Sequence, residues 1–522
     1  MPRSIIQRLL TIFFIISRIG LFAQVADQLP RSNPEAEWVS SSDIIRFLDT
    51  LAKTNNEFHS IMILRHGKVI AEGWWNPYRP DLRHMMYSTS KSFTSTAVGF
   101  AVSEGRIKLS DKLVSFFPSI LPDTVNTKLA NLTLRDVITM SDGQRPDPTG
   151  AAMATPNWAQ FFLSRPIPDT PGVNFLYNSL GTYMLSAVVQ KVTGQTILDY
   201  LRPRLFEPLG IAGMDWETSP QGIDAGGWGL RVKTEDMAKF GKLYLQKGAW
   251  NGKQILSSAW IEEATSYKIN NAEPNSTPEV REASDWAQGY CYQFWRCRHN
   301  AYRADGAFGQ YIIVLPDQDA VIAITSESIS MQNELNLIWT FLLPAFKSEK
   351  LPVDSSAYNL LRGKLAGLKL MPPVAMDNPL TETAVSGKIF TLDSNERKFD
   401  RISFQFKKKV CQVKIRNDGK DYVMDCAEGS WHLGETNLPG ATPSIIRAPN
   451  GPHADLGPAK YAGAYTWKDQ NTLELTFRYI ESPHTQFLVC HFDHGLLSME
   501  FDGSVQRMAH RKNQLIKGVP LN

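Results

Sequence analysis

The stretch Tyr87-Ser88-Thr89-Ser90-Lys91-Ser92-Phe93 begins an apolar run, residues 93–102, that predicts a buried helix. Ser88 and Lys91 are three residues apart, so on a helix their Cβ atoms share one face, about 5–6 Å from each other. A serine hydroxyl becomes a nucleophile when a neighbouring base takes its proton. Lysine can be that base once burial or a helix N-terminus lowers its pKa. The stretch predicts a serine hydrolase, but such spacings also arise by chance, so other parts of the chain must complete the site.

The overall composition is that of an ordinary globular protein. The chain has 522 residues, of which 43% are hydrophobic and 20% charged, and this length predicts two domains. The net charge is only +3, which argues against the strongly basic surface that nucleic-acid binding requires. The short basic run Lys407-Lys408-Lys409 is interpreted as the solvated face of a strand. We therefore expect no nucleic-acid partner.

Residues 1–24 have the pattern of a secretory signal peptide. Two arginines precede a short apolar run, as in the n-region and h-region of such peptides. Arg18 interrupts the apolar stretch, so a stable membrane span of ~20 apolar residues is not expected. Cleavage near Ala23 or Gln24 and a periplasmic or secreted protein are the expectation, with an uncleaved anchor as the alternative.

Two parts of the mature chain differ in pattern. In residues 25–347, strand-like segments near both ends enclose a helix-rich block, which predicts an antiparallel sheet built from both ends and flanked by helices. Residues 348–383 look like a linker. Residues 384–522 are nearly all short alternating strands, which predicts a β-barrel or sandwich. The expected fold is α+β, a sheet and a helical subdomain followed by a C-terminal β-domain.

Some elements are predicted individually. His66-Gly67-Lys68 joins two β-type runs as a hairpin, and residues 230–245 have the clearest helical period. Cys291 and Cys297 fall in one strand-like segment, too far apart to bond to each other. If Asp418-Gly419 is a type I′ turn, Cys411 and Cys426 lie directly opposite each other, and whether they form a disulfide is left open.

A tyrosine could complete the proton transfer. Tyr177 follows the Pro171-Gly172 turn and sits at the start of a predicted helix. A phenol near a lysine ammonium has a lowered pKa and could move a proton between the nucleophile and the leaving group. The alternative is a tyrosine that packs on the core and bonds to water.

A second segment could supply an oxyanion hole. Small residues in Arg303-Ala304-Asp305-Gly306-Ala307-Phe308-Gly309-Gln310-Tyr311 lead into a strand. The Ala307 N–H could then face a substrate carbonyl oxygen together with the Ser88 N–H. Each such donor typically contributes roughly 2.7–4 kcal/mol in the transition state. The alternative is an ordinary glycine-rich turn.

Taken in order, S-T-S-K, F-L-Y-N-S and D-G-A-F-G-Q-Y resemble the serine β-lactamase-like hydrolases of the class C type. That family includes class C β-lactamases, D-amino-acid peptidases, some esterases and 6-aminohexanoate-dimer hydrolases. The resemblance implies that Ser88 is the nucleophile, Lys91 its base and Tyr177 a second acid–base, with Ser88 and Ala307 forming the oxyanion hole. It implies no metal or cofactor. Its tentative substrate-lining residues are Tyr87, Ser179, Trp228, Asp305 and Gly306.

Two departures from the family pattern bear on the substrate. The second motif is usually Y-x-N, but Ser179 stands in its third place. The third motif is usually K-T-G or H-x-G, whereas Ala304-Asp305-Gly306 lacks the leading cation that helps hold a β-lactam carboxylate. These changes disfavour an efficient β-lactamase and favour a neutral or amine-bearing ester or amide. Residues 308–311 look nearer to the 6-aminohexanoate-dimer hydrolases.

Other hydrolase motifs fit less well. Ser141-Asp142-Gly143 imitates the S-D-N element of penicillin-recognising enzymes, but its third residue differs, and no catalytic role is expected. The chain has no G-x-S-x-G and no H-E-x-x-H. A small-molecule or short-oligomer substrate is expected. The open alternatives are a β-lactamase, a D-amino-acid peptidase, or a sensor that acylates without turnover. The sequence leaves the oligomeric state unknown.

Overall fold

The computed structural model describes residues 28–446, 456–508 and 513–521. The predicted signal peptide, residues 1–24, lies outside this part of the chain. Among the described helices, none combines the length and apolar character that crossing a membrane requires.

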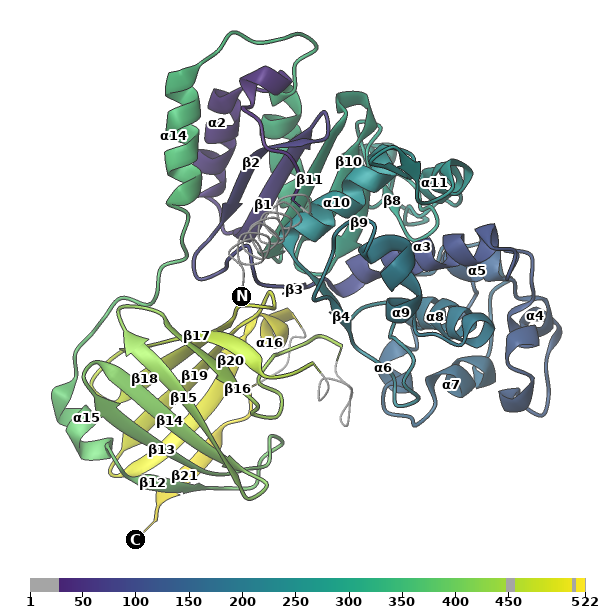
Figure 1. The fold of residues 1–522 in the computed structure, drawn as a ribbon. Coiled ribbons are helices and arrows are strands. Elements are labelled where there is room, and N and C mark those ends of the chain that lie inside the picture. Colours follow the sequence, from purple (N-terminus) through teal and green to yellow (C-terminus); the bar gives the residue numbers. More distant parts are fainter. Residues whose placement is uncertain (1–27, 447–455, 509–512, 522) are drawn as a thin grey trace, which may run out of the picture.

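The first part of the chain forms a six-stranded antiparallel sheet in the order β2-β1-β11-β10-β9-β8 (Figure 1). Its strands come from both ends of this part, as predicted. The β1–β2 hairpin turns through His66 and Gly67, whose φ values of 50° and 73° are typical of a type I′ turn. The strands are β1 (Glu57–Arg65), β2 (Lys68–Trp74), β8 (Trp295–Arg296), β9 (Tyr302–Gly306), β10 (Gln310–Leu315) and β11 (Ala320–Glu327).

The sheet is buried on both faces. Ile61 and Ile63 of β1 face one core, while Met62 and Leu64 face the other, because successive side chains of a strand point to opposite sides. On the first face lie α2 (Ser41–Leu51), α13 (Met331–Leu337), the π-helical turn η7 (Ile338–Leu342) and α14 (Ser355–Ala366). On the second lies α10 (Thr234–Leu245).

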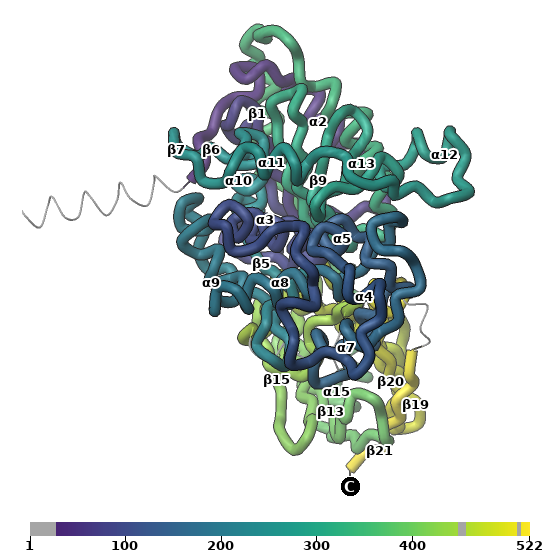
Figure 2. The backbone as a smooth tube through the Cα atoms, turned by 90° about the vertical axis from the view of Figure 1, so that its right-hand side faces the viewer, coloured from purple at the N-terminus to yellow at the C-terminus, as the bar shows by residue number. Residues whose placement is uncertain are grey.

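A helical block inserted between β2 and β8 contains the candidate site. Figure 2 shows helices α4, α5, α7 and α8 on the side facing the viewer. The block begins with η2 (Tyr87–Thr89) and α3 (Ser90–Ser103). It continues with α4 (Thr127–Asn131), α5 (Leu134–Ile138), α6 (Thr149–Ala152), α7 (Trp158–Ser164), α8 (Ser179–Thr193), α9 (Ile197–Leu201), α11 (Ser258–Thr265) and α12 (Pro278–Ala283). Beside it, β3 (His84–Met85), β5 (Leu230–Val232) and β4 (Asp215–Trp216) form a small sheet.

The C-terminal part is a closed barrel, which confirms the prediction of a barrel-like β-domain. A continuous antiparallel run from β15 to β17 is closed by a parallel pairing between those two strands, and β16 lies outside the ring. The strands are β12 (Ile389–Leu392), β13 (Phe399–Lys407), β14 (Val410–Asn417), β15 (Lys420–Glu428), β16 (His432–Thr436), β17 (Ala459–Trp467), β18 (Thr472–Tyr479), β19 (Thr485–Asp493), β20 (Leu496–Gly503) and β21 (Ile516–Pro520). The short helix α16 (Ser504–Met508) follows β20.

The predicted register around the β14–β15 turn is confirmed. Asp418 and Gly419 have φ values of 49° and 73°, and Cys411 pairs with Cys426 across the strands. Both thiols are free and buried in the barrel, so the pairing predicted by the turn does not carry a disulfide. Burial raises the pKa of each thiol well above its usual value.

Three expectations about local structure were wrong or incomplete. Cys291 and Cys297 do not share a strand, because Gln293 has a φ of 63° and the chain reverses there, pairing Tyr290 with Trp295. Residues 230–232 form strand β5, so the helix predicted from residue 230 begins only at Thr234.

The segment predicted as a linker contains α14, whose Leu361 is buried in the core beside the sheet. It also contains most of α15 (Pro379–Val385). The periodic signal of α14 in the sequence is weak, because Leu361 is its one fully buried residue. The segment therefore packs on the first part of the chain as well as joining it to the barrel.

Candidate active site

The proposed nucleophile lies at the start of a buried helix. Ser88 is in the one-turn helix η2, and α3 follows directly from it with Lys91 one turn further on. The Lys91 Nζ donates a hydrogen bond to Ser88 Oγ over 3.0 Å. Ser88 is half-buried, so part of the residue remains exposed. The structure thus brings together the two side chains that the three-residue spacing placed on one face.

Lys91 is almost completely buried, with 2% of its surface exposed. Its Nζ also donates to Ser179 Oγ (3.1 Å) and to the Gly227 carbonyl oxygen (2.8 Å). Burial lowers the pKa of Lys91 to about 7, with Asp147 and Asp305 acting in the opposite direction. An amine with this pKa is neutral in a large fraction of molecules near pH 7, so it can accept the proton of Ser88.

The segment that holds Lys91 from the opposite side depends on close packing. A Cβ on Gly227 would lie 2.7 Å from the Ser179 carbonyl oxygen, so glycine lets this backbone approach α8. Trp228 is not a cleft-lining residue: only 2% of it is exposed, and it packs against Trp158 with ring centroids 5.6 Å apart. Its preference for the interior follows from the large apolar surface of an indole. Trp228 packs in the core next to Gly227, whose carbonyl oxygen accepts the hydrogen bond from Lys91.

Tyr177 reaches the same place from the residue before the N-cap of α8. Its ring stacks on Trp295 at 5.7 Å, and Lys91 Nζ lies 4.7 Å from its ring centroid. Burial raises the pKa of Tyr177, while interaction with the Ser88 hydroxyl opposes the shift. The expectation of a lowered pKa was therefore wrong, because desolvation of the phenol is the largest effect and the charges of Asp305 and Asp147 act in the same direction. Tyr177 stays protonated and is suited to donate a proton.

The presence of Ser179 in place of the usual asparagine of the Y-x-N motif changes which side chain contacts Lys91. Ser179 takes the hydrogen bond from Lys91, whereas Asn178 is turned away and caps α8 through its Oδ1, which accepts from the Gly181 N–H at 3.1 Å. The Asn178 amide also donates to Asp142 Oδ2 (2.9 Å). Burial raises the pKa of Asp142 to about 7. The Ser141-Asp142-Gly143 stretch thus anchors the Tyr177 turn.

The predicted oxyanion residues lie beside the nucleophile. Thr89 Oγ1 donates to the Gln310 carbonyl oxygen (2.8 Å), which ties the turn at Ser88 to β10. Ala307 follows the end of β9 and is half-buried. Among the described residues, the Ala307 N–H has no backbone acceptor. Ser88 is in the first turn of its helix, where N–H groups lack intrahelical acceptors.

Replacing Gly306 by alanine is expected to lower kcat/KM at least about 100-fold, because misplacing reacting groups by ~1 Å has effects of this size. The new Cβ would lie 2.2 Å from the Met86 carbonyl oxygen and 3.0 Å from Thr89 Oγ1, which would force β9 away from the nucleophile. Steady-state kinetics with a melting curve would measure this. Gly363→Ala on α14 is the control, since its Cβ would meet nothing within 4 Å. Equal kinetics for both variants would contradict the prediction.

Asp305 is close to the site but already paired. Arg303 donates to its Oδ2 through Nε over 2.8 Å, and only 9% of Asp305 is exposed. Arg303 itself lies over the Trp286 ring, 4.4 Å from the centroid. The carboxylate therefore acts on Lys91 as a nearby charge, and the Arg303 pairing leaves it little capacity to bind a substrate amine.

The sequence interpretation missed Asp147. Its Oδ2 accepts from the Ser179 N–H (3.3 Å), and its charge raises the pKa of Lys91. The residue is exposed, so its carboxylate can meet a substrate. Asp147-Pro148-Thr149 looks like the start of a helix, and Asp147 Oδ1 does accept from the Thr149 N–H at 2.9 Å. No local pattern in the sequence indicates that this carboxylate lies beside Lys91.

Tyr87, a predicted wall residue, is buried and turned toward the barrel. Its hydroxyl is hydrogen-bonded to His484 Nε2, and its ring packs against Phe308 with centroids 5.8 Å apart. Burial raises its pKa. No grouping of three or more His, Cys, Asp or Glu side chains suited to a metal ion occurs within the described ranges.

Comparison with known proteins gives a consistent picture. The family model described as Beta-lactamase matches residues 58–334. The 6-aminohexanoate-dimer hydrolase of Paenarthrobacter ureafaciens is 24% identical over 281 residues, covering 50% of this chain and 71% of that protein. A β-lactamase of Escherichia coli is 21% identical over 315 residues, covering 49% and 78%.

A solved structure agrees in fold. It is a Bacillus anthracis protein assigned to the 6-aminohexanoate-dimer hydrolases, with a TM-score of 0.50 and 21% identity, covering 62% of this chain and 89% of that one. The matched residues 58–334 include Ser88, Lys91, Tyr177 and Ala307, the residues that the structure gathers at one site. The chain belongs to the β-lactamase family and has the fold of its serine hydrolases.

Proposed function

We propose that this protein hydrolyses an amide or ester bond through an acyl-enzyme on Ser88. The observation that carries the proposal is the 3.0 Å hydrogen bond between Lys91 Nζ and Ser88 Oγ, made by a buried lysine whose pKa is lowered to about 7. A serine paired with a base of this strength is an activated nucleophile.

The geometry supports a division of labour between the two proton-transfer groups. Lys91 takes the proton as Ser88 Oγ attacks the carbonyl carbon, and the N–H groups of Ser88 and Ala307 stabilise the oxyanion. Tyr177, kept protonated by burial, donates a proton to the leaving amine or alcohol. Water then attacks the acyl carbonyl carbon and gives a proton to the Tyr177 phenolate, and the Lys91 ammonium returns its proton to Ser88 Oγ as the acid leaves.

The substrate we propose is a small molecule or a short oligomer with a neutral or amine-bearing amide or ester. Ala304 stands where the family usually has a cation, and the neighbouring Arg303 is held by Asp305. The exposed carboxylate of Asp147, beside Ser179 and Lys91, is the better candidate for a substrate amine. The relation to the 6-aminohexanoate-dimer hydrolase of Paenarthrobacter ureafaciens supports a linear amide as one member of this class.

The expected location is the periplasm or the medium. The proposal rests on the signal-like pattern of residues 1–24, with two arginines before a short apolar run. Mass spectrometry of the N-terminus after expression in a bacterial host would test it, since an intact Met1 in an exported or cytoplasmic product would contradict cleavage near Ala23.

A fluorophosphonate probe is expected to label the mature protein once, at Ser88, as measured by intact mass and peptide mapping. Labelling at another serine would reject the assignment.

A panel of short esters, D-amino-acid amides, linear amide oligomers and a chromogenic cephalosporin then identifies the substrate class. Steady turnover of an ester or linear amide supports a hydrolase. A single stoichiometric burst would favour a sensor, and efficient cephalosporin hydrolysis would contradict the argument from Ala304.

A further inference from the structure

We propose that His484 of the C-terminal barrel is a positioning residue for the oxyanion hole, acting through Tyr87 and Phe308. This inference rests on the proposed function. Tyr87 contributes the carbonyl half of the peptide group whose N–H belongs to Ser88, and Phe308 directly follows Ala307 in the turn after β9. The His484 side chain therefore contacts Tyr87, which precedes the proposed donor Ser88, and Phe308, which follows the proposed donor Ala307.

The contacts of His484 are specific. Its Nε2 is hydrogen-bonded to the Tyr87 hydroxyl. Its ring meets Phe308 edge to face, with centroids 4.7 Å apart and planes at 88°, an arrangement that aromatic rings favour. The three rings of His484, Tyr87 and Phe308 therefore form one buried cluster at the boundary between the barrel and the hydrolase part.

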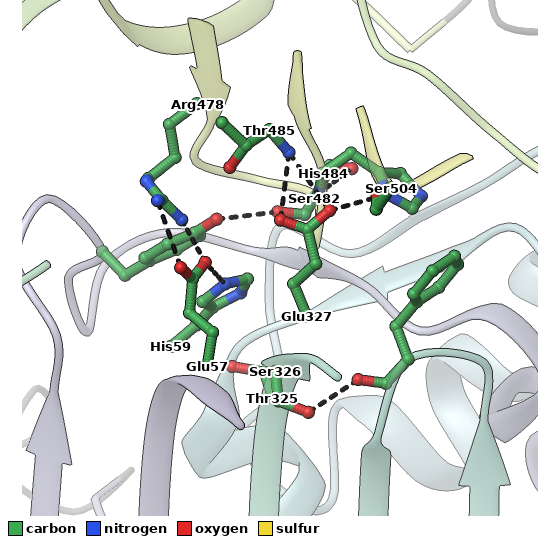
Figure 3. Close-up of polar contacts among 12 residues, drawn as sticks. Glu57, His59, Thr325, Ser326, Glu327, Arg478, Ser482, His484, Thr485 and Ser504 are labelled. Carbon is green, nitrogen blue, oxygen red and sulfur yellow. Dashed lines mark hydrogen bonds and ion pairs between the residues drawn. The ribbon is translucent and has the colours of Figure 1, made fainter. Parts of the chain in front are cut away.

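The other ring nitrogen fixes the imidazole. Nδ1 lies 3.3 Å from Glu327 Oε1 at the end of β11 and 2.9 Å from Ser504 Oγ (Figure 3). Because a carboxylate only accepts, Nδ1 carries the proton, and Nε2 is left to accept from the Tyr87 O–H. The Thr485 N–H also donates to Glu327, at 3.2 Å. The histidine is thus held from the sheet and from the barrel.

The backbone at both contacted residues explains why such support is needed. Tyr87 has a φ of 46° and Phe308 a φ of 65°, values that bulky residues rarely adopt. Conformations of this kind cost of order 1–3 kcal/mol and persist only where surrounding contacts fix them. For Phe308, Ser326 Oγ donates to its carbonyl oxygen (2.7 Å), and His484 packs on its ring. For Tyr87, His484 bonds to the hydroxyl at the end of the side chain, where the Ser444 side chain and the Ile445 backbone also interact with it.

Neighbouring contacts hold the hairpin between β18 and β19 that carries His484. Arg478 of β18 pairs with Glu57 of β1 (Figure 3). The Tyr78 hydroxyl donates to the Ser482 carbonyl oxygen (3.2 Å). These bonds join the same two parts of the chain but do not touch Tyr87 or Phe308. They make it possible to weaken the interface without altering the oxyanion contacts.

Two variants test the proposal on the full chain, with the ester or amide that the panel identifies. His484→Phe keeps the ring against Phe308 but removes the acceptor for Tyr87, and Tyr87→Phe removes the same bond from the other side. Each is expected to lower kcat roughly 10- to 100-fold, short of the 10²–10³ for complete loss of a donor. A boronic acid that forms a tetrahedral adduct on Ser88 should bind more weakly by a similar factor, while KM changes less than about threefold, because the oxyanion exists only in the transition state.

The double variant His484→Phe/Tyr87→Phe should lose less than the two single losses combined, because both substitutions remove the bond between His484 and Tyr87. Tyr78→Phe is the matched control and should keep kcat and boronate affinity while weakening the interface. If His484→Phe does not fold, as judged by its melting curve, Tyr87→Phe carries the test alone. Unchanged kcat in Tyr87→Phe, or equal losses in Tyr78→Phe, would overturn the inference. Absence of probe labelling at Ser88 in the unaltered protein would instead overturn the proposed function.

Discussion

Ser88→Ala is expected to abolish turnover, with kcat falling by about 10⁶-fold for the substrate that the unaltered protein hydrolyses, as loss of a serine nucleophile does in other serine hydrolases. The reason is chemical, because alanine has no oxygen to attack the carbonyl or to carry the acyl group. The Lys91 amine would remain buried beside Ser179 and Gly227. Substrate binding should therefore be retained within a few-fold. Stopped-flow and steady-state assays, together with fluorophosphonate labelling, would measure the loss.

The matched control for this variant is Ser103→Ala, which removes a hydroxyl from the exposed end of α3, the helix that follows Ser88. It should leave kcat unchanged. Residual activity of Ser88→Ala above about one thousandth of the original would show that another group is the nucleophile, since non-covalent stabilisation alone accounts for 10³–10⁴ over the uncatalysed reaction. Labelling of the Ser88→Ala protein would lead to the same conclusion.

Lys91→Met is expected to lower kcat/KM by roughly 10⁴-fold, at the upper end of what a general base contributes. In the unaltered protein, burial lowers the pKa of Lys91 to about 7. The reactive form is the neutral amine, which gains population as pH rises. The rate should therefore increase about tenfold per pH unit below pH 7 and level off above it. In Lys91→Met this inflection should vanish, as measured by kcat/KM from pH 5 to 9.

Lys242→Met is the control for the titration. Burial also lowers the pKa of Lys242, but its Nζ donates to the Gly67 carbonyl oxygen, away from Ser88. That variant should keep both the rate and the inflection near pH 7. An inflection that persists in Lys91→Met would assign the titration to another group, such as Asp142, whose pKa burial raises to about 7. Asp142 must then be replaced by asparagine to identify it.

Much of the fold could be predicted because it depends on local patterns. The type I′ turns at His66-Gly67 and Asp418-Gly419 need residues that tolerate positive φ, and they set the registers of β1–β2 and β14–β15. The alternation of the C-terminal strands predicted a barrel-like domain. The weak points were Gln293, whose positive φ breaks a strand-like run, and α14, whose buried face is narrow.

What the sequence by itself determined is the set of side chains that share a helix or a turn. The spacing of Ser88 and Lys91 puts them on one helical face. The turn before α8 puts Tyr177 directly before the N-cap of that helix. The order of the three motifs also identified the family. These features depend on residues that are close in the sequence, so they can be predicted without knowing how the rest of the chain folds.

Only the tertiary structure decided the electrostatics and the supporting contacts of the site. The pKa of Lys91 falls and that of Tyr177 rises because both are desolvated, and desolvation depends on what packs around a residue. Asp305 is paired with Arg303, its neighbour on the same face of β9, and both are buried because of what packs over that face. His484 reaches Tyr87 from 397 residues away. A contact between two domains leaves no periodic pattern in either of them, so its place beside the nucleophile exists only in the folded chain.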